Sequence, residues 1–561
     1  MQLPQALSDA LQLCRESLVA AFVFSLFANL LNLVPALYML NVYDKAITSG
    51  SVYTLWSLTI FAAAMFGMLF VMEALRGRLL VAISARLDGV VGPELYQRTF
   101  INAVNVGGHR ASVQPLQDFL GLRQFITGNG IFAIFDAPWL PVYLFVMYLF
   151  HPIIGLIGLC AAILLVIIGL INQKKTEPAL TRANIFSAQS SAATHRTLRN
   201  AEVVEAMGML PQLQETWSSN QEQLLIHQSA ASNSSVFFNA LTKTIRLATQ
   251  SAAIAAGAYL VIKQEISPGM LIAGSLLVGR ALQPVEIALG SWKGFVDAKT
   301  YYNRICEVLN NIRVPEERMA LPPLTGEVSV VNAVLAPPGE AQPTVIYASF
   351  KIMGGECACI LGPSGAGKSS LMRGLLGLWP TTNGEIRLSG GEASKYLRHE
   401  IGPQLGYLPQ DIELLEGSVS ANICRFGELD SEAIIEASRA AGVHELILSL
   451  ADGYETKIDQ PGGMLSPGQR QRIALARAVY KWPKLVILDE PNSNLDEAGE
   501  LALIQAMSSL KARGSTIICV THRQSILPLA DKVILMNAGR IVREGPANEI
   551  LTEIASHQKT A

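Results

Sequence analysis

Gly362-Pro363-Ser364-Gly365-Ala366-Gly367-Lys368-Ser369 is the most informative stretch of the chain. It matches the pattern G-x-x-x-x-G-K-[ST] at every fixed position, which is typical of a phosphate-binding loop. Residues 356–361 before it predict a buried strand and residues 370–378 after it predict a helix, so the motif has the strand-loop-helix context that such a loop requires. This context disfavours the alternative, a glycine-rich turn without a ligand.

A loop of this kind holds phosphate through inward-turned backbone N–H groups and through the positive end of the following helix. We therefore expect residues 362–369 and Ser370 to bind the phosphates of a nucleotide. Lys368 is expected to reach the terminal phosphates, and Ser369 is expected to ligate Mg²⁺.

Composition indicates that part of the chain does not face water. Half of its 561 residues are hydrophobic, and the mean hydropathy of +0.33 is high for a soluble protein. The net charge of −2 gives no indication of a nucleic-acid partner. Seven scattered cysteines, including Cys357 and Cys359, form neither a disulfide framework nor a metal spacing, so we expect reduced structural thiols.

Six hydrophobic stretches are long enough to cross about 30 Å of hydrocarbon. They are residues 17–40, 52–71, 131–150, 153–171, 236–262 and 270–292. A signal peptide is the alternative for the first stretch, but acidic Asp9 and Glu16 precede it and no cleavage pattern follows. We therefore expect a retained span with a bend at Pro35.

The distribution of basic residues predicts the orientation of these spans. The connections 76–130 and 173–235 carry six and five Lys or Arg residues, whereas Lys45 in 41–51 and Lys263 stand alone in the opposite connections. The positive-inside rule therefore places both long connections, both chain ends and the phosphate-binding loop in the cytoplasm.

The two long connections are expected to continue the membrane helices into the cytoplasm. Each contains a short amphipathic segment, 115–125 in the first and 202–209 in the second. Docking on a cytoplasmic domain and packing within the helical bundle are both consistent with these segments, and the sequence does not choose between them.

Charged residues inside the spans are either structural or functional. For Asp136, beside Ala137-Pro138-Trp139, we favour structural pinning over a transport role. The last two spans are weaker, since one contains Lys243 and Arg246 and the other Arg280 and Glu286. These charges are expected near cytoplasmic ends or around an interior cavity.

After a predicted linker at 311–325 the pattern becomes α/β, with three further motifs. The predicted apolar strand at 485–490 ends in Asp489 and Glu490, which suit a Mg²⁺ shell and the polarisation of an attacking water, respectively. Leu465-Ser466-Pro467-Gly468-Gln469 opens a helix whose N-terminus offers a second place for phosphate oxygens. His522 follows strand 516–520, where an imidazole is suited to hold the γ-phosphate.

Together these motifs resemble the nucleotide-binding domain of ABC transporters. The resemblance implies Gln410 in Tyr407-Leu-Pro-Gln as the Q-loop glutamine and a further Mg²⁺ ligand beside Ser369 and Asp489. It implies Glu490 as the catalytic carboxylate, Ser493-Asn-Leu-Asp496 as the D-loop and His522 as the switch histidine, with Lys368 among the catalytic groups. In that family Ser466, Gly468, Gln469 and Asp496 belong to motifs that complete the ATP site of a second copy, so a homodimer with two shared sites is implied.

The implied fold is a membrane all-α six-span exporter bundle fused to an α/β P-loop ABC nucleotide-binding domain. Residues 1–310 would form the transmembrane domain with its two long cytoplasmic connections, 311–325 the linker and 326–561 the ATP-binding domain.

A finer resemblance is to type I secretion permease/ATPases of Gram-negative bacteria, the alkaline protease exporter-like branch. It is carried by Leu-Asp489-Glu-Pro-Asn-Ser-Asn-Leu-Asp496-Glu-Ala-Gly-Glu, by Phe135-Asp-Ala-Pro-Trp-Leu-Pro141 and by His151-Pro152. It implies an inner-membrane protein that exports an unfolded polypeptide with a C-terminal signal, together with a periplasmic adaptor and an outer-membrane channel. Alternating access driven by ATP, with hydrolysis through Glu490, is the implied mechanism.

Three other functions compete with this interpretation. A lipid or drug exporter shares every ATPase motif, although such exporters usually read Ala-Thr-Ser-Ala where this chain reads Pro491-Asn-Ser-Asn494. An importer would need separate permease subunits, which the fused spans argue against. If the chain were an ATPase that does not transport, replacement of Glu490 by glutamine would leave secretion intact.

The sequence departs from the family pattern at two places. Pro467 replaces the usual first glycine of the signature, which removes one N–H and fixes φ, so we expect an altered contact with the opposing phosphate. Residues 336–338 read Ala-Pro-Pro where many relatives carry an aromatic residue that stacks on adenine. Tyr347 is the candidate replacement.

Overall fold

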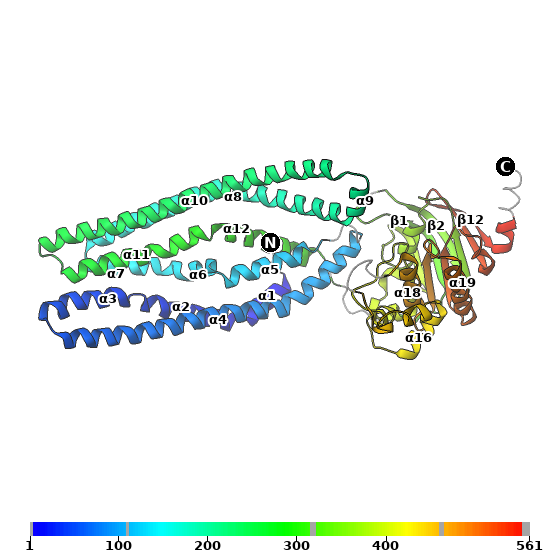
Figure 1. The fold of residues 1–561 in the computed structure, drawn as a ribbon, viewed down its shortest axis with the longest axis horizontal. Coiled ribbons are helices and arrows are strands. Elements are labelled where there is room, and N and C mark those ends of the chain that lie inside the picture. Colours follow the sequence, from blue (N-terminus) through cyan, green and yellow to red (C-terminus); the bar gives the residue numbers. More distant parts are fainter. Residues whose placement is uncertain are drawn as a thin grey trace. The chain divides into compact units, whose positions relative to one another are not determined.

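The computed structural model describes residues 4–107, 112–312, 314, 321–340, 342–458 and 465–552 (Figure 1). The described residues fall into two compact units, one from 4–101, 112–312 and 314 and the other from 102–107, 321–340, 342–458 and 465–552. Part of the predicted linker, residues 313 and 315–320, lies outside the described residues.

The first unit consists of helices. They are α1 (Gln5–Leu13), α2 (Arg15–Leu31), α3 (Val34–Asn41), a π-helical turn (Val42–Ile47), α4 (Val52–Asn105), α5 (Gln114–Thr127), α6 (Asn129–Asp136), a 3₁₀ turn (Ala137–Trp139), α7 (Leu140–Phe150), α8 (Pro152–Arg199), α9 (Ala201–Ala206), α10 (Leu210–Ile262), α11 (Pro268–Gly290) and α12 (Trp292–Asn311). Among the described residues, six helical segments are long and apolar enough to cross a membrane, which confirms the predicted number of spans.

The helices α4, α8 and α10 are much longer than a membrane crossing. They have 54, 48 and 53 residues, respectively. At 1.5 Å per residue a 50-residue helix extends for about 75 Å, whereas the hydrocarbon layer is about 30 Å thick. The prediction that membrane helices continue through the long connections is therefore confirmed.

Pro35 and Pro152 lie at interruptions of the predicted spans. The first span breaks between Leu31 and Val34, one residue before Pro35, because proline has no N–H to donate to the preceding turn. His151 adopts an extended conformation that ends α7, and Pro152 starts α8. The predicted bend at Pro35 is present, and a tight turn at His151-Pro152 separates the third and fourth spans.

The predicted connection over residues 41–51 is largely helical. The first helical segment continues through the π-helical turn to Ile47. Asp44 in this turn has hydrogen-bond partners within the protein. Its carboxylate accepts hydrogen bonds from the Ser267 hydroxyl (2.5 Å) and from the Gly269 backbone N–H (2.9 Å) at the start of α11.

The contacts of Asp136 support the structural interpretation of this residue. Its carboxylate accepts hydrogen bonds from Arg76 at 2.9 Å and from the Asn29 amide at 2.7 Å. Arg76 also pairs with Glu73 at 2.7 Å, and the Tyr143 hydroxyl donates to the Asn29 carbonyl at 2.8 Å. The network joins α2, α4, α6 and α7.

We expect Asp136→Ala to lower the free energy of unfolding by about 3 kcal/mol, because it leaves the buried Arg76 guanidinium with a single carboxylate. Thermal unfolding in detergent checks this. Asp88→Ala is the matched control, since the half-exposed Asp88 pairs with Arg123 and should contribute less than about 1 kcal/mol. Equal losses in the two variants would contradict the pinning role.

The two amphipathic segments differ in their environment. Residues 115–125 belong to α5, which packs on α12. Phe119 is buried there, and Asp118 pairs with Arg304 at 2.7 Å. Packing within the bundle is therefore the interpretation that holds for this segment. The second segment contains α9. Val203 in this helix and Met207 directly after it are exposed, and docking of this segment stays a prediction.

The second unit is α/β. Its strands are β1 (Val328–Leu335), β2 (Val345–Ile352), β3 (Cys357–Leu361), β4 (Asn383–Leu388), β5 (Gly391–Glu392), β6 (Leu405–Leu408), β7 (Gly417–Ser418), β8 (Lys457–Ile458), β9 (Leu485–Asp489), β10 (Thr516–Val520), β11 (Lys532–Asn537) and β12 (Arg540–Pro546). Its α-helices are α13 (Lys368–Leu375), α14 (Arg398–Ile401), α15 (Val419–Ile423), α16 (Ser431–Ala440), α17 (His444–Leu448), α18 (Pro467–Val479) and α19 (Glu497–Ala512).

The central sheet has the strand order β12-β11-β3-β10-β9-β6, in which all neighbours are parallel except β11 and β12. Alternate residues of its strands enter two different hydrophobic clusters. Cys519 and Leu488 belong to one cluster, whereas Ile518 and Ile487 belong to the other. Parallel strands that are covered on both faces are expected to be continuously apolar, which explains the unbroken runs at 485–488 and 516–520.

All seven cysteines are unpaired, and only Cys160 is exposed. This agrees with the prediction of reduced structural thiols.

Candidate nucleotide-binding site

The topology of the central sheet assembles the predicted site. The phosphate-binding loop follows β3, His522 follows β10 by one residue, Glu490 follows β9 and Gln410 follows β6. These four strands are adjacent and parallel, in the order β3-β10-β9-β6, so their carboxyl ends meet at one edge of the sheet. Ligands of open α/β sheets bind outside the carboxyl ends of the strands.

The glycines of the loop are needed for its geometry. Gly365 and Gly367 have φ of 80° and 91°, a conformation that favours glycine. A Cβ on Gly362 would lie 2.2 Å from the Met536 carbonyl oxygen, and one on Gly367 would lie 2.4 Å from that of Thr344. Side chains at either position would push the loop away from its support.

Lys368 is the first residue of α13, and its side chain is buried against the loop. Its Nζ donates to the Gly362 carbonyl at 2.7 Å and to the Pro363 carbonyl at 2.9 Å. Burial lowers the pKa of Lys368, and the nearby Glu490 and Asp489 carboxylates oppose this shift. The ammonium group is thus held over the loop by carbonyl oxygens that a phosphate can replace.

Asp489 ends β9 and is buried. Burial raises the pKa of Asp489, while a hydrogen bond from the Ser369 hydroxyl lowers it. Its Oδ1 atom has no hydrogen-bond partner among the described residues. A buried carboxylate oxygen without a partner, beside a hydroxyl, is suited to ligate a hard divalent cation.

Glu490 is held between two of the other predicted residues. Its carboxylate accepts a hydrogen bond from the Gln410 amide at 3.0 Å and lies 3.6 Å from Nε2 of His522. Glu490 has a φ of 48°, which is unusual for a residue with a side chain and is maintained here by a backbone hydrogen bond to Val520. The strained backbone turns the carboxylate out of the strand, between Gln410 and His522.

The signature segment opens α18 with a capping box. Ser466 Oγ accepts from the Gln469 N–H at 3.3 Å, and Gln469 Oε1 accepts from the Ser466 N–H at 2.8 Å. Pro467 occupies the first helical position, where its missing N–H breaks no helix bond and its φ suits the helix. Proline therefore fits this helix start, and its effect on a phosphate contact stays a prediction.

Gln471 is a buried residue that the sequence analysis missed. Its amide donates to the Pro491 carbonyl, and its Oε1 accepts from the Asn494 N–H at 3.0 Å. It therefore joins the signature helix to the D-loop, whose Asp496 caps α19 through the Gly499 N–H at 2.9 Å. The sequence contained one signal for this role. Gln471 is polar, whereas positions 473–476 and 478–479 of the same helix are apolar and line the core.

We expect Gln471→Ala to lower the ATP hydrolysis rate several-fold with little change in ATP affinity, because the backbone groups of Pro491 and Asn494 lose their partner at a cost of about 1–3 kcal/mol. Steady-state hydrolysis and nucleotide titration separate the two effects. Gln505→Ala on the exposed face of α19 is the control and should behave as wild type. A Gln471→Ala enzyme with unchanged turnover would show that this link is dispensable.

The adenine side of the site is less defined. Ala336 is only partly exposed, whereas Tyr347 has 58% of its surface exposed and lies in an irregular part of β2 with a φ of 49°. Its stacking on a base stays a prediction.

Family models and known proteins agree on the class of this chain. A model of the ABC transporter ATPase matches residues 347–493, and a model of the ABC transporter transmembrane region matches residues 118–285. A solved bacterial Atm1-family ABC exporter with ATP bound superposes with a TM-score of 0.83 over 96% of both chains, at 20% identity. The last similarity establishes the fold alone.

Sequence relatives narrow the class further. The type I secretion system ATP-binding protein PrsD of Rhizobium meliloti (strain 1021) is 39% identical over 551 residues, which cover 98% of this chain and 95% of the relative. The leukotoxin translocation ATP-binding protein LktB of Mannheimia haemolytica is 28% identical over 96% of this chain and 76% of the relative. The chain is therefore an ATP-binding, ATP-hydrolysing transporter with several membrane spans, and it belongs to the type I secretion branch of the ABC transporters.

Proposed function

We propose that this protein is a homodimeric ATPase and permease that exports an unfolded polypeptide with a C-terminal signal across the bacterial inner membrane. The observation that carries the proposal is the full-length similarity to a type I secretion ATP-binding protein, in a chain whose central sheet brings the loop of residues 362–369, Gln410, Glu490 and His522 to one edge. A lipid or drug exporter is the second candidate, and the comparisons do not favour it.

We assign residues 1–310 to the transmembrane domain, 311–325 to the linker and 326–561 to the ATP-binding domain. In the second part, residues 362–370 would hold the phosphates of ATP, and Lys368 would neutralise the terminal phosphates. Glu490 would orient and polarise the attacking water, because it is the carboxylate held between Gln410 and His522.

A magnesium ion fits the donors at this edge. The unpartnered Asp489 oxygen and the adjacent Ser369 hydroxyl are hard oxygen ligands. When bound, the ion would neutralise charge that develops on the phosphates. Gln410 contacts Glu490 in this structure, so its role as a further ligand stays a prediction.

The signature segment of one copy would complete the site of the other. Ser466, Gly468 and Gln469 form a helix start that the capping box preorganises, and the positive end of α18 with the exposed Ser466 would meet the phosphate. Gln471 would then transmit closure of the shared site to the D-loop with Asp496. Two ATP molecules would hold the copies together, and hydrolysis would separate them.

A periplasmic adaptor and an outer-membrane channel are the partners that type I secretion requires. We infer both partners from the family. The helical bundle in a lipid bilayer would deliver the polypeptide to them. We propose no nucleic-acid partner, in line with the net charge of −2.

Stimulation of the ATPase discriminates between the two candidate functions. For the purified protein in nanodiscs, we expect a polypeptide carrying a C-terminal secretion signal to raise ATP turnover, and the same polypeptide without that signal to have no effect. Small amphiphiles are expected to leave turnover unchanged. Stimulation by amphiphiles alone would favour the lipid or drug exporter.

A further inference from the structure

A polar stripe runs along α11, which is otherwise apolar. Arg280, Gln283 and Glu286 follow one another at spacings of three residues and Gly279 lies four residues before Gln283, so they share one face of the helix. The remaining surface packs tightly, with Val278, Ala281 and Leu282 fully buried. The helix α11 contacts α3, α6, α7, α8 and α10 of the bundle (Figure 1). Arg280 and Glu286 are partly buried there, whereas Gln283 is exposed.

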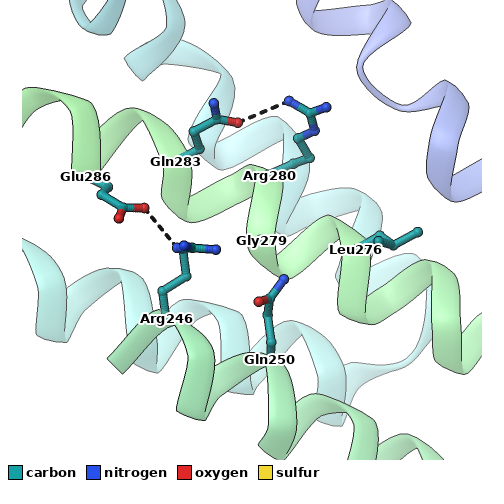
Figure 2. Close-up of a pocket in the computed structure, with 7 residues that line it drawn as sticks. All are labelled: Arg246, Gln250, Leu276, Gly279, Arg280, Gln283 and Glu286. Carbon is teal, nitrogen blue, oxygen red and sulfur yellow. Dashed lines mark hydrogen bonds and ion pairs between the residues drawn. The ribbon is translucent and has the colours of Figure 1, made fainter. Parts of the chain in front are cut away.

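Two cavities open on this stripe and share Arg280 and Gln283. One has a volume of about 330 Å³ and is also lined by Arg246 and Gln250 of α10. Figure 2 shows these α10 side chains extending toward α11, where Arg280 and Gln283 face each other. The other has a volume of about 210 Å³ and reaches the network of Asp136.

The three arginines around the cavities differ in their partners. Arg246 pairs with Glu286 at 2.8 Å, and Arg76 pairs with both Glu73 and Asp136. Arg280 instead donates to the neutral Gln283 amide at 3.1 Å. In the described part of the chain no carboxylate lies within ion-pair distance of Arg280, so its positive charge is left for a ligand.

Arg280 lies near the middle of α11, which is long and apolar enough to cross a membrane. It is twelve residues after Pro268, or about 18 Å along the helix, in a hydrocarbon layer about 30 Å thick. Ionisable residues at such depth face an interior cavity and mark pathways for polar solutes. A lipid headgroup would reside closer to the membrane boundary.

We propose that Arg280, together with Gln283 and Gln250, forms a carboxylate-binding site for acidic segments of the exported polypeptide. This inference rests on the proposed function and names the residues that recognise the substrate. A guanidinium group binds a carboxylate with two parallel hydrogen bonds. The neighbouring amides supply donors and acceptors that match peptide N–H and C=O groups.

The test uses the full-length dimer in nanodiscs of neutral lipid, without nucleotide. The probes are a short labelled peptide containing aspartates and the same peptide with asparagines in their place, and fluorescence anisotropy gives the affinities. We expect wild-type protein to bind the aspartate peptide about tenfold more tightly. Arg280→Gln should remove this preference, Arg280→Lys should retain part of it, and Arg78→Gln, an exposed arginine of α4, should leave it intact.

Each other outcome overturns the inference. Equal affinities for the two peptides in wild-type protein, or a preference that survives Arg280→Gln, would exclude this recognition. Loss of peptide binding on adding phosphatidylglycerol to the nanodiscs would identify an anionic lipid as the occupant. If the protein secretes its cargo in cells but shows no carboxylate preference, only this inference fails, whereas loss of secretion as well would refute the proposed function.

Discussion

Glu490→Gln is expected to lower the rate of ATP hydrolysis by at least about 100-fold, which is the usual contribution of a general base. The amide of glutamine keeps the shape of the side chain and can still contact Gln410, but it cannot accept a proton from water. Since Glu490 is not part of the phosphate-binding loop, ATP affinity should change by less than about threefold. Measurements of turnover and of nucleotide binding on the same purified protein check both statements.

Glu497→Gln is the matched control for Glu490→Gln. Glu497 is an exposed carboxylate in the first turn of α19, seven residues further along the chain, and its replacement should leave turnover unchanged. Glu490→Asp should retain a fraction of the activity, because it shortens the side chain but keeps a base. If Glu490→Gln hydrolyses ATP at the wild-type rate, another group activates the water.

Dimers with two different subunits are expected to show that each ATP site is shared between copies. Lys368→Ala disables the loop, and Ser466→Arg places a bulky cation on the exposed helix start that should meet the opposing phosphate. If one subunit carries the first substitution and its partner the second, one site keeps an intact loop and an intact signature. Such dimers should retain about half of the wild-type turnover, as expected for two independent sites.

The matched control places both substitutions in one subunit, beside a wild-type partner. Each of the two shared sites then contains one defect, and turnover should be close to zero. Differently tagged subunits purified by two successive affinity steps provide both kinds of dimer. The reverse pattern, with activity only when both defects reside in one subunit, would mean that each copy hydrolyses ATP alone.

Local patterns in the sequence predicted most of the fold. Hydropathy indicated the six spans, because each crossing of the membrane needs a continuous apolar segment. The motif beginning at Gly362 and the acidic end of the strand at Asp489 indicated the α/β unit, because both features are contiguous in the chain. Their meeting at one edge of the sheet depends on the order of the parallel strands. The motifs indicated this order only through the resemblance to a known family.

Features that depend on residues far away in the sequence were not predicted. The helical turn around Asp44 forms because Ser267 and Gly269, more than 200 residues away, satisfy its carboxylate. Gln471 gained its role from backbone groups of the D-loop. Arg280 was recognised as a charge in a span, but its lack of a carboxylate partner became visible only when the neighbouring helices were in place.

Secretion by living cells tests most directly whether ATP use in this chain drives polypeptide export. Cells would produce the protein with its adaptor, its outer-membrane channel and a candidate cargo encoded beside it, and the cargo would be quantified in the medium. We predict that cargo leaves cells with the wild-type chain and stays inside cells with Lys368→Ala. Export of the cargo by Lys368→Ala, or Lys368-dependent release of small molecules alone, would contradict the account.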